Sequence, residues 1–219
     1  MQYIYAPGCA LMSYKPLLAK RLKDVIEKKY GSMGTILTCC FDTPALPPDT
    51  CVISPCPTCV ERYSKYDDCT ALCFLNDLAS DETFPFPDYG GAEMSIQDTC
   101  AARKQPDVLQ AVRRLLQRMN IRLVEPQFTG SRARCCGQVY YGKLSEEKVE
   151  TNMKKRADEM PCQDVVVYCS SCIMSMTVGG RRPRFILDLL FGEQTDMSGI
   201  TAVRWNNTLA EFRGRHKQP

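Results

Sequence analysis

The chain has 219 residues, of which 44% are hydrophobic and 24% are charged, a composition typical of folded globular proteins. Its formal net charge of +3 is too small to indicate nucleic-acid binding by itself. Fourteen cysteines stand against one histidine, His216. A single histidine excludes zincin motifs, two-cysteine two-histidine zinc fingers and Rieske centres, and it leaves Ser-His-Asp and Cys-His catalysis without a well-placed proton carrier.

Neither membrane insertion nor export is expected from the apolar segments. The longest apolar runs are shorter than a membrane span, and Pro7 and Gly8 interrupt the first of them, which also lacks a basic segment before it. We therefore expect a cytoplasmic protein, free or peripheral to a membrane complex, in which thiols stay reduced unless a metal takes them. A framework of disulfides is the weaker alternative.

In the first half, short apolar runs and turn residues predict small strands that alternate with helices. The predicted elements are a strand at 2–5, a helix from Pro16 to just before Gly31, a strand at 34–38, a loop at 41–50, a strand at 51–54 and a short helix after Cys59. Pro16 suits the first turn of a helix, and Gly31 suits the position beyond its end.

The second half repeats this alternation with longer helices. The predicted elements are a strand at 93–97, a helix from Pro106 to Met119, a strand at 121–125, a helix capped by Ser145 that extends to Met160, a strand at 164–168 and a helix at 183–191. The predicted domain organisation is a first half at 1–83, a linker at 84–92, a second half at 93–195 and a C-terminal tail at 196–219.

Ten of the cysteines follow one order twice: a lone cysteine, a vicinal pair and a C-x-x-C. The first set is Cys9, Cys39, Cys40, Cys56 and Cys59, and the second set is Cys100, Cys135, Cys136, Cys169 and Cys172. Five cysteines in the same order, twice, indicate an internal duplication.

Each cysteine group follows a predicted strand, and a loop separates the strand at 121–125 from Cys135. Strands alternating with helices predict parallel sheets with right-handed crossovers, in which the loops after the strands share one edge. We therefore expect an α/β fold made of two pseudo-repeated small parallel-sheet halves, with the cysteine loops at the carboxyl ends of the strands. Each half then brings five thiols to one place.

Converging thiols favour a metal centre. Two thiolates about 4 Å apart repel each other by about 4 kcal/mol at an effective dielectric constant near 20, and a cationic centre removes that repulsion. Structural zinc takes four ligands, whereas each set offers five, and neighbouring cysteines suit a polynuclear cluster better than one tetrahedral ion. Zinc, or no metal and a simple core role, is the alternative interpretation.

Four cysteines lie outside the repeated order: Cys51, Cys69, Cys73 and Cys162. Cys69 and Cys73 are four residues apart on a predicted helix, where they are placed to replace or supplement a ligand of the first half. A role in the hydrophobic core is favoured for all four, because free cysteine is among the most buried residue types.

The sequence resembles the cysteine-rich CCG domain family, and within it the catalytic B subunit of heterodisulfide reductase, which carries two such domains. The motifs that carry the resemblance are Ala6-Pro7-Gly8-Cys9, Cys39-Cys40, Pro55-Cys56-Pro57-Thr58-Cys59, Asp98-Thr99-Cys100, Cys135-Cys136-Gly137 and Tyr168-Cys169-Ser170-Ser171-Cys172. The resemblance implies a non-cubane [4Fe-4S] cluster on each five-cysteine set, with one cluster on each side of a substrate disulfide that is reduced. On that basis the second set carries the catalysis, through its cluster, and both sets bind cofactor.

The first half departs from the family pattern. Only 15 residues separate its vicinal pair from its C-x-x-C, against 32 in the second half, so a helix is missing there. Phe41 stands where the second half has Gly137, and Gln97 occupies a position where many relatives have histidine. The second site is therefore the better supported of the two.

Basic residues crowd around the second motif: Arg103, Lys104, Arg132, Arg134, Arg181, Arg182 and Arg184. They suit an anionic thiol or disulfide substrate, a partner subunit or a solvated face. No G-x-G-x-x-G motif or P-loop is present, so we expect no NAD, FAD or ATP site. The resemblance implies that electrons come from a ferredoxin-like iron–sulfur subunit fed by a flavoprotein.

The leading hypothesis is an oxidoreductase subunit with one or two [4Fe-4S] clusters that reduces a disulfide or passes electrons between subunits. The alternative is a non-catalytic electron-relay or zinc-binding structural subunit of a larger redox complex. Small thiols or disulfides are the expected substrates, and neither nucleic acid nor an integral membrane segment is expected.

Overall fold

The computed structural model describes residues 1–42, 44–67 and 69–217. The chain divides into two compact units, of which unit 1 comprises residues 1–77 and 206–219 and unit 2 comprises residues 78–205. Among the described residues, no helix combines the length and apolar character needed to cross a bilayer.

Unit 1 is built on a four-stranded parallel sheet with the strand order β2-β1-β3-β4. Its elements in chain order are β1 (Gln2–Tyr5), α1 (Cys9–Tyr14), α2 (Pro16–Tyr30), β2 (Gly34–Thr35), β3 (Thr50–Ser54), α3 (Pro57–Tyr63), β4 (Cys69–Cys73) and α4 (Phe74–Ala79), the last of which continues into unit 2. Tyr5 at the end of β1 donates a hydrogen bond from its hydroxyl to the carbonyl of Ala19, which ties α2 to the sheet.

Unit 2 is built on a second four-stranded parallel sheet, with the order β6-β5-β7-β8. Its elements are β5 (Ala92–Gln97), a 3-10 turn at Cys100–Lys104, α5 (Pro106–Arg118), β6 (Ile121–Leu123), short 3-10 turns at Gly130–Arg132 and Gln138–Tyr140, α6 (Glu146–Asp158), β7 (Asp164–Val167), α7 (Ser170–Val178), β8 (Arg182–Phe185) and α8 (Ile186–Leu190).

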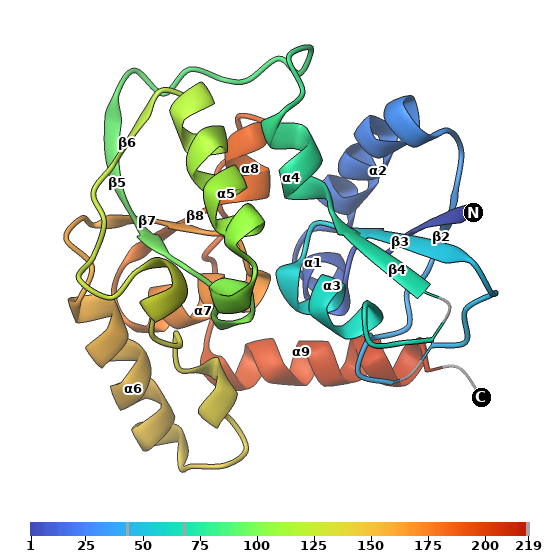
Figure 1. The fold of residues 1–219 in the computed structure, drawn as a ribbon. Helices are drawn as coiled ribbons and strands as arrows, with labels where there is room; N and C mark the ends of the chain where they lie inside the picture. The colour runs from blue at the N-terminus through green and yellow to red at the C-terminus, as the bar shows by residue number, and fades with distance from the viewer. Residues whose placement is uncertain (43, 68, 218–219) are drawn as a thin grey trace. The chain divides into compact units, whose positions relative to one another are not determined.

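The two sheets share one topology, because in each the second strand lies outside the first and the third and fourth follow on the other side. Right-handed crossovers then place the helix after the first strand on one face and the helix after the third strand on the other. Figure 1 shows α5 and α7 on opposite sides of the sheet of unit 2, and α2 and α3 on opposite sides of the sheet of unit 1. The prediction of two pseudo-repeated parallel-sheet halves is confirmed.

This topology selects the edge at which ligands bind. In both units the first and third strands are neighbours, and their crossovers leave in opposite directions, which opens a crevice beyond their carboxyl ends. Cys9 and Cys56 follow the two central strands of unit 1, and Cys100 and Cys169 follow those of unit 2.

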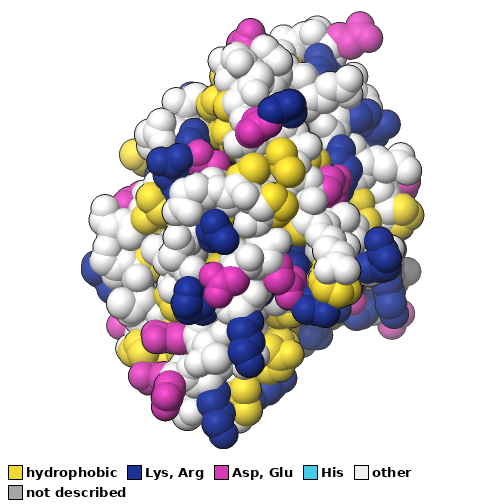
Figure 2. All heavy atoms as spheres, turned by 90° about the vertical axis from the view of Figure 1, so that its left-hand side faces the viewer, with side chains coloured by type: hydrophobic (Ala, Val, Ile, Leu, Met, Phe, Trp, Pro, Cys, Tyr) yellow, Lys and Arg dark blue, Asp and Glu magenta, His cyan; other side chains and the backbone are white. Residues whose placement is uncertain are grey.

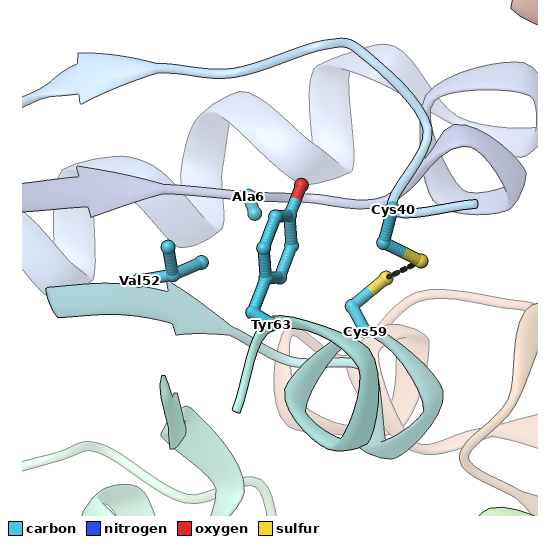
Figure 3. Packing of buried hydrophobic residues seen from close by; sticks show 5 residues of the cluster. All are labelled: Ala6, Cys40, Val52, Cys59 and Tyr63. Carbon is cyan, nitrogen blue, oxygen red and sulfur yellow. Dashed lines mark hydrogen bonds between the residues drawn. The ribbon is translucent and has the colours of Figure 1, made fainter. Parts of the chain in front are cut away.

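The core of each unit lies between its sheet and its helices. In unit 2, α5 buries one face at helical spacing, and that face consists of Val108, Ala111, Val112, Leu115 and Leu116. In unit 1, two patterned cysteines belong to a buried cluster that Figure 3 shows from close by, made of Ala6, Cys40, Val52, Cys59 and Tyr63. The thiols of unit 1 are thus packed as core residues as well as gathered together.

Several sequence predictions differ from the structure. Residues 69–73 form the edge strand β4 and not a helix, because they pair in register with β3. The predicted helix at 183–191 is a strand, β8, followed by the one-turn helix α8, because its first residues pair with β7. The predicted strand at 34–38 is limited to β2, and the short helix expected after Cys59 begins earlier, at Pro57.

The stretch between β2 and β3 has no helix among its described residues, 36–42 and 44–49. The corresponding connection of unit 2 contains α6. The shortened first half predicted from the spacing of its cysteines is therefore a shortened crossover.

The C-terminal segment contains a helix that the sequence analysis did not predict. Helix α9 spans Ala202–Arg215, beginning in unit 2 and ending in unit 1. Trp205 donates a hydrogen bond from Nε1 to Ser171 Oγ, 3.3 Å away, within unit 2. Arg213 pairs with Asp42 within unit 1, with 2.9 Å between Nη2 and Oδ1.

Candidate metal centre

The five patterned cysteines of unit 2 lie on three loops at the carboxyl edge of its sheet. Cys100 opens the 3-10 turn that follows β5, and Cys169, in an extended conformation, is the N-cap of α7 directly after β7. Cys135 and Cys136 precede Gly137, whose φ of +103° is one that side-chain-bearing residues rarely adopt. A Cβ on Gly137 would lie 2.7 Å from Met153 Cγ, so only glycine lets the vicinal pair approach α6 so closely.

These five thiols form a continuous row. Side-chain hydrogen bonds join Cys100 to Cys135, Cys135 to Cys136, Cys136 to Cys172 and Cys172 to Cys169. Cys100 and Cys172 are 72 residues apart in the sequence, so the row exists only because the sheet brings the loops together. The structure therefore gathers all five residues that the sequence predicts for the second site.

The electrostatics of the row favour one central thiolate. Hydrogen bonds from the thiols of Cys100 and Cys136, together with the backbone N–H groups of Gly137 and Val139, hold the pKa of Cys135 far below its ordinary value against the opposing effect of burial. The pKa of Cys100 is raised, chiefly by its hydrogen bond to Cys135 and then by burial. These shifts favour the thiolate form at Cys135, with the thiols of Cys100 and Cys136 as its hydrogen-bond donors.

Unit 1 contains the same row in the same order. Cys9 Sγ lies 3.6 Å from Cys39 Sγ, and Cys40 Sγ lies 3.7 Å from Cys59 Sγ. Side-chain hydrogen bonds also join Cys39 to Cys40 and Cys59 to Cys56. All five residues predicted for the first site are therefore brought together, although the crossover in this unit is short.

In unit 1 the thiolate form is favoured most at Cys39, the counterpart of Cys135. Its pKa is lowered by hydrogen bonds from Cys40 and Cys9, by the N–H of Phe41 and by the positive charge of Arg213. The pKa of Cys56 is also lowered, first by the Cys59 thiol and then by the N–H groups of Cys59 and Thr58 at the start of α3. The sequence analysis missed Arg213, because nothing in the sequence places residue 213 near residue 39.

The remaining four cysteines are not part of the hydrogen-bonded rows, although Cys69 packs against the cluster of Cys40 and Cys59. Cys51 and Cys69 are on the neighbouring strands β3 and β4, while Cys162 lies just before β7. Cys73 is buried at the end of β4, where burial raises the pKa of its thiol and the N–H groups of Leu75 and Asn76 lower it. All fourteen cysteines are among the described residues, and all are free thiols.

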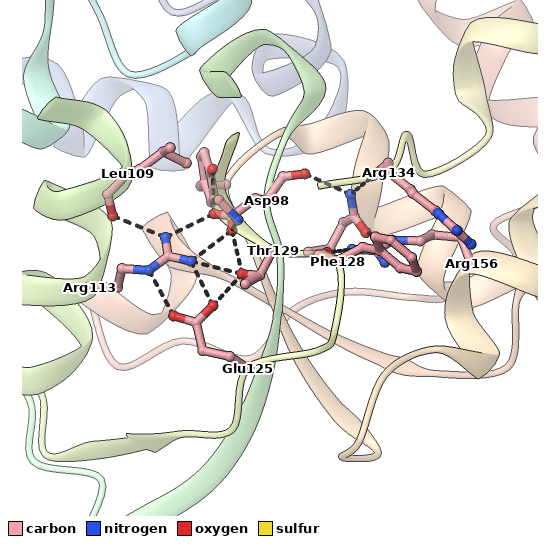
Figure 4. A network of polar contacts seen from close by, with 11 residues as sticks. Asp98, Leu109, Arg113, Glu125, Phe128, Thr129, Arg134 and Arg156 are labelled. Atoms are coloured by element: carbon pink, nitrogen blue, oxygen red, sulfur yellow. Dashed lines mark hydrogen bonds and ion pairs between the residues drawn. The ribbon is translucent and has the colours of Figure 1, made fainter. Parts of the chain in front are cut away.

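A buried carboxylate links the three cysteine loops of unit 2 (Figure 4). Asp98, fully buried two residues before Cys100, accepts hydrogen bonds from Arg113 of α5 (2.7 Å from Nη2), from the Gly130 N–H (2.7 Å) and from the Tyr168 hydroxyl (2.7 Å). Burial raises the pKa of Asp98, but these donors outweigh it and the pKa lies below the ordinary value. Tyr168 adjoins Cys169, so one carboxylate fixes loops on both central strands.

Glu125 and Thr129 complete this network. The guanidinium of Arg113 reaches Glu125 with Nε at 2.9 Å, and Thr129 donates from its hydroxyl to Asp98 at 2.9 Å. Arg113 therefore bridges two carboxylates, and its pKa is raised by both of them although burial opposes the shift. The sequence analysis did not identify this network; its one sequence signal is an aspartate between a buried strand and a patterned cysteine.

Gln97 fills the position that the resemblance associates with histidine. It is fully buried, and its amide nitrogen donates to the carbonyls of Asp98 (2.7 Å) and Arg134 (3.0 Å). Its amide oxygen accepts from Nε of Arg156 at 2.6 Å, and Arg156 itself is only 2% exposed. Gln97 thus joins the loop of Cys100 to the loop of Cys135 and has no spare donor for catalysis.

The chemistry of the donor set fits an iron–sulfur centre. Each row consists of thiols alone, and cysteine thiolate is the standard ligand of such clusters. Five thiols exceed the four ligands of structural zinc. Across residues 1–42, 44–67 and 69–217, no three or more His, Cys, Asp or Glu side chains are arranged as the ligands of a metal ion. The thiols of each row are hydrogen-bonded to one another instead, so the fit to a cluster rests on their number and chemistry.

Comparison with protein families gives a match within unit 2. Residues 94–177 match the family model of the cysteine-rich domain CCG. The matched stretch begins in β5, ends in α7 and contains all five patterned cysteines of unit 2. A search of curated proteins found no match for the chain. The cysteine-rich domain and the two thiol rows indicate an iron–sulfur or metal-binding role.

Proposed function

We propose that the chain is an iron–sulfur redox subunit of the heterodisulfide reductase type, which reduces a disulfide. The row of five thiols in unit 2 supports this most directly, because it lies inside the stretch that matches the cysteine-rich domain. Cys100, Cys135, Cys136, Cys169 and Cys172 would hold a [4Fe-4S] cluster. When bound, such a cluster supplies one-electron transfer at a potential within about −700 to +450 mV and iron atoms to which sulfur binds.

The protein supplies positioning. The hydrogen bonds of Asp98 and Gln97 hold the loops of Cys100, Cys135 and Cys169 together at one edge of the sheet, which reduces the ordering that ligand binding requires. Hydrogen bonds from the thiols of Cys100 and Cys136, and then from the peptide N–H groups of Gly137 and Val139, lower the pKa of Cys135 and so favour the thiolate, which is the form that binds metal.

The reaction that we propose takes up two electrons and two protons for each disulfide and releases two thiols. Stable disulfides have potentials below about −300 mV, so the donor must be of low potential. We propose that a ferredoxin-like iron–sulfur partner, itself reduced by a flavoprotein, supplies the electrons. We also propose a second cluster on the row of unit 1, held by Cys9, Cys39, Cys40, Cys56 and Cys59.

The first test is iron and acid-labile sulfide analysis of anaerobically purified protein. We expect about eight irons per chain if both rows hold a cluster and about four if only one does. Cys172→Ala should remove about four of them together with the matching sulfide, whereas Cys162→Ala, outside the row in the same unit, should remove none. Zinc without sulfide would contradict the redox function and support the structural alternative.

A second test separates a catalyst from an electron relay. The loaded protein is assayed for disulfide reduction with a low-potential artificial donor, and Cys100→Ala is compared with Cys162→Ala. We expect Cys100→Ala to abolish turnover and Cys162→Ala to leave it unchanged. A protein that holds iron and sulfide and accepts electrons, yet reduces none of a panel of small disulfides, would be a relay.

A further inference from the structure

A hollow opens beside the thiol row of unit 2. Its volume is about 810 Å³, within the usual range of small-molecule sites. Cys100 and Cys135 line it on one side. Its charged lining consists of Arg103, Arg132, Arg134, Lys155, Arg156 and Glu159, which is five basic side chains and one carboxylate.

The single carboxylate of the hollow is already paired. Oε1 of Glu159 accepts a hydrogen bond from Nη1 of Arg134 at 2.6 Å, and Oε2 accepts one from Nη1 of Arg156 at 2.5 Å. Arg134 also stacks on the ring of Phe128, 3.6 Å from its centre, so these two arginines are anchored parts of the wall. Among the described residues, Arg103, Arg132 and Lys155 have no carboxylate as an ion-pair partner.

Arg103 adds an independent observation. Its Nε is buried and has no hydrogen-bond acceptor in the described part of the chain. Arg103 as a whole is partly exposed, but a buried N–H without an acceptor costs free energy, and such groups in native structures are often completed by a water, an ion or a ligand. An anion in the hollow would supply an acceptor and a counter-charge for this guanidinium.

The concentration of positive charge is local. The face turned to the viewer in Figure 2 interleaves Lys and Arg with Asp and Glu, so basic residues there have acidic neighbours. The hollow differs because its cations outnumber its carboxylates and surround a concave space. Low-dielectric concave walls strengthen the attraction for an anion small enough to enter.

We propose that this hollow is a binding site for a small molecule that carries a phosphate or carboxylate group, with Arg103 and Arg132 as its principal recognition residues. Guanidinium groups bind both oxyanions through paired hydrogen bonds. Because Cys100 and Cys135 line the same hollow, a molecule held there lies against the thiol row. This site goes beyond the proposed redox role, and its occupancy is measured without turnover.

The test is calorimetric titration of the purified protein at constant ionic strength with three probes: pyrophosphate, malonate and the uncharged malonamide. We expect saturable binding of pyrophosphate or malonate and no binding of malonamide. Arg103→Gln and Arg132→Gln, each removing a charged hydrogen-bond donor, should weaken binding about tenfold or more. Arg114→Gln removes an exposed arginine of α5 that does not line the hollow, and should change the affinity by less than about twofold.

Each result of the titrations has its own interpretation. The tighter of the two anions identifies the head group, and equal binding of both supports the anion site without choosing between them. Failure of both anions to saturate the protein would overturn the proposal, as would an equal loss in the Arg114→Gln variant, which would assign the binding to general surface charge. Thermal unfolding of each variant shows that it is folded, and iron content is scored separately, so loss of the cluster is not mistaken for loss of the anion site.

Discussion

Units 1 and 2 have the same strand order and the same row of five thiols, but they hold these rows differently. In unit 2 the loops are tied by a buried carboxylate, Asp98, with donors on α5, on the loop after β6 and beside Cys169. In unit 1 residues Pro7 and Pro55 occupy the positions of Asp98 and Tyr168, so no such link is available. The topology alone is therefore sufficient to gather the thiols, and the polar network is an addition specific to unit 2.

In unit 1, two polar contacts lie beside the row of thiols. The hydroxyl of Tyr66 donates to the carbonyl of Cys40 at 2.9 Å, and Arg213 pairs with Asp42 close to Cys39. Arg213 also provides positive charge that lowers the pKa of Cys39. The side chain of Arg213 is 42% exposed, whereas Asp98 is fully buried, so salt and solvent weaken the contact in unit 1 far more.

The largest expected difference between the units comes from Asp98→Ala against Asp42→Ala. Loss of Asp98 leaves Arg113, Thr129 and Tyr168 without their shared acceptor, and breaking a buried pair in this way costs about 3–5 kcal/mol. Loss of Asp42 breaks a partly exposed pair worth about 1 kcal/mol or less. Urea unfolding followed by circular dichroism gives both values. Equal losses would show that the buried network does not distinguish the units.

The glycines beside the cysteines offer a second comparison. Gly137→Ala forces a Cβ to within 2.7 Å of Met153 Cγ at a positive φ, and overpacking together with backbone strain should cost about 2–4 kcal/mol. Gly8→Ala, at φ +85° with its Cβ 3.2 Å from Cys59 Sγ, should cost about 1–3 kcal/mol.

The two glycine variants should also differ in iron content, which is measured with the unfolding free energy. Each is expected to lower the iron held by its own unit and to leave that of the other unit unchanged. Met153→Ala removes the nearest of these contacts in the Gly137 variant, that with Cγ, and it should recover part of the iron binding there but none in the Gly8 variant. A Gly137→Ala protein with full iron and normal stability would mean that the vicinal pair does not need this close approach.

Removing one tyrosine hydroxyl from each unit should cause smaller losses of stability that still differ between the units. Tyr168→Phe removes a 2.7 Å hydrogen bond to an ionised buried carboxylate and should cost about 1.5–3 kcal/mol. Tyr66→Phe removes a hydrogen bond to a neutral carbonyl and should cost about 0.5–1.5 kcal/mol. Chemical denaturation resolves this difference, and the reverse ranking would contradict a special role for Asp98.

The smallest expected effect is a pH dependence. Burial raises the pKa of Asp164, but Arg182 and Arg184 outweigh it and the folded pKa lies below the unfolded value of about 3.9. The stability that Asp164 contributes is therefore complete above that value and is lost as the pH falls through the lower, folded pKa. Because Arg182 is 53% exposed, the gain is at most about 1 kcal/mol.

Asp164→Asn should flatten the acid limb of a plot of unfolding free energy against pH, with no change near neutrality beyond the lost ion pair. High salt should shrink the difference between the two proteins. A steeper acid limb in the variant would show that the carboxylate is not stabilised in the folded state.

Sequence patterns predicted the long amphipathic helices of unit 2 correctly. The helix opened by Pro106 and the helix after Ser145 were predicted from apolar spacing and first-turn residues, and both are present. Residues 69–73 and 183–185 were misassigned because short segments become strands when a neighbouring strand offers hydrogen bonds, which no local pattern reveals. Helix α9 was missed because its apolar stripe is weak and depends on what it covers.

The arrangement of cysteines along the chain determined by itself that the fold is duplicated and that the sulfurs follow strands. Parallel pairing then requires those loops to share an edge, which is a consequence of backbone hydrogen bonding and needs no detailed packing. Only the tertiary structure decided which polar groups surround the sulfurs: Asp98 with Arg113, Gln97 with Arg156, and Arg213 near Cys39. Such pairs join positions from 15 to 174 residues apart, and side-chain electrostatics acts over a few ångströms of space without regard to separation along the chain.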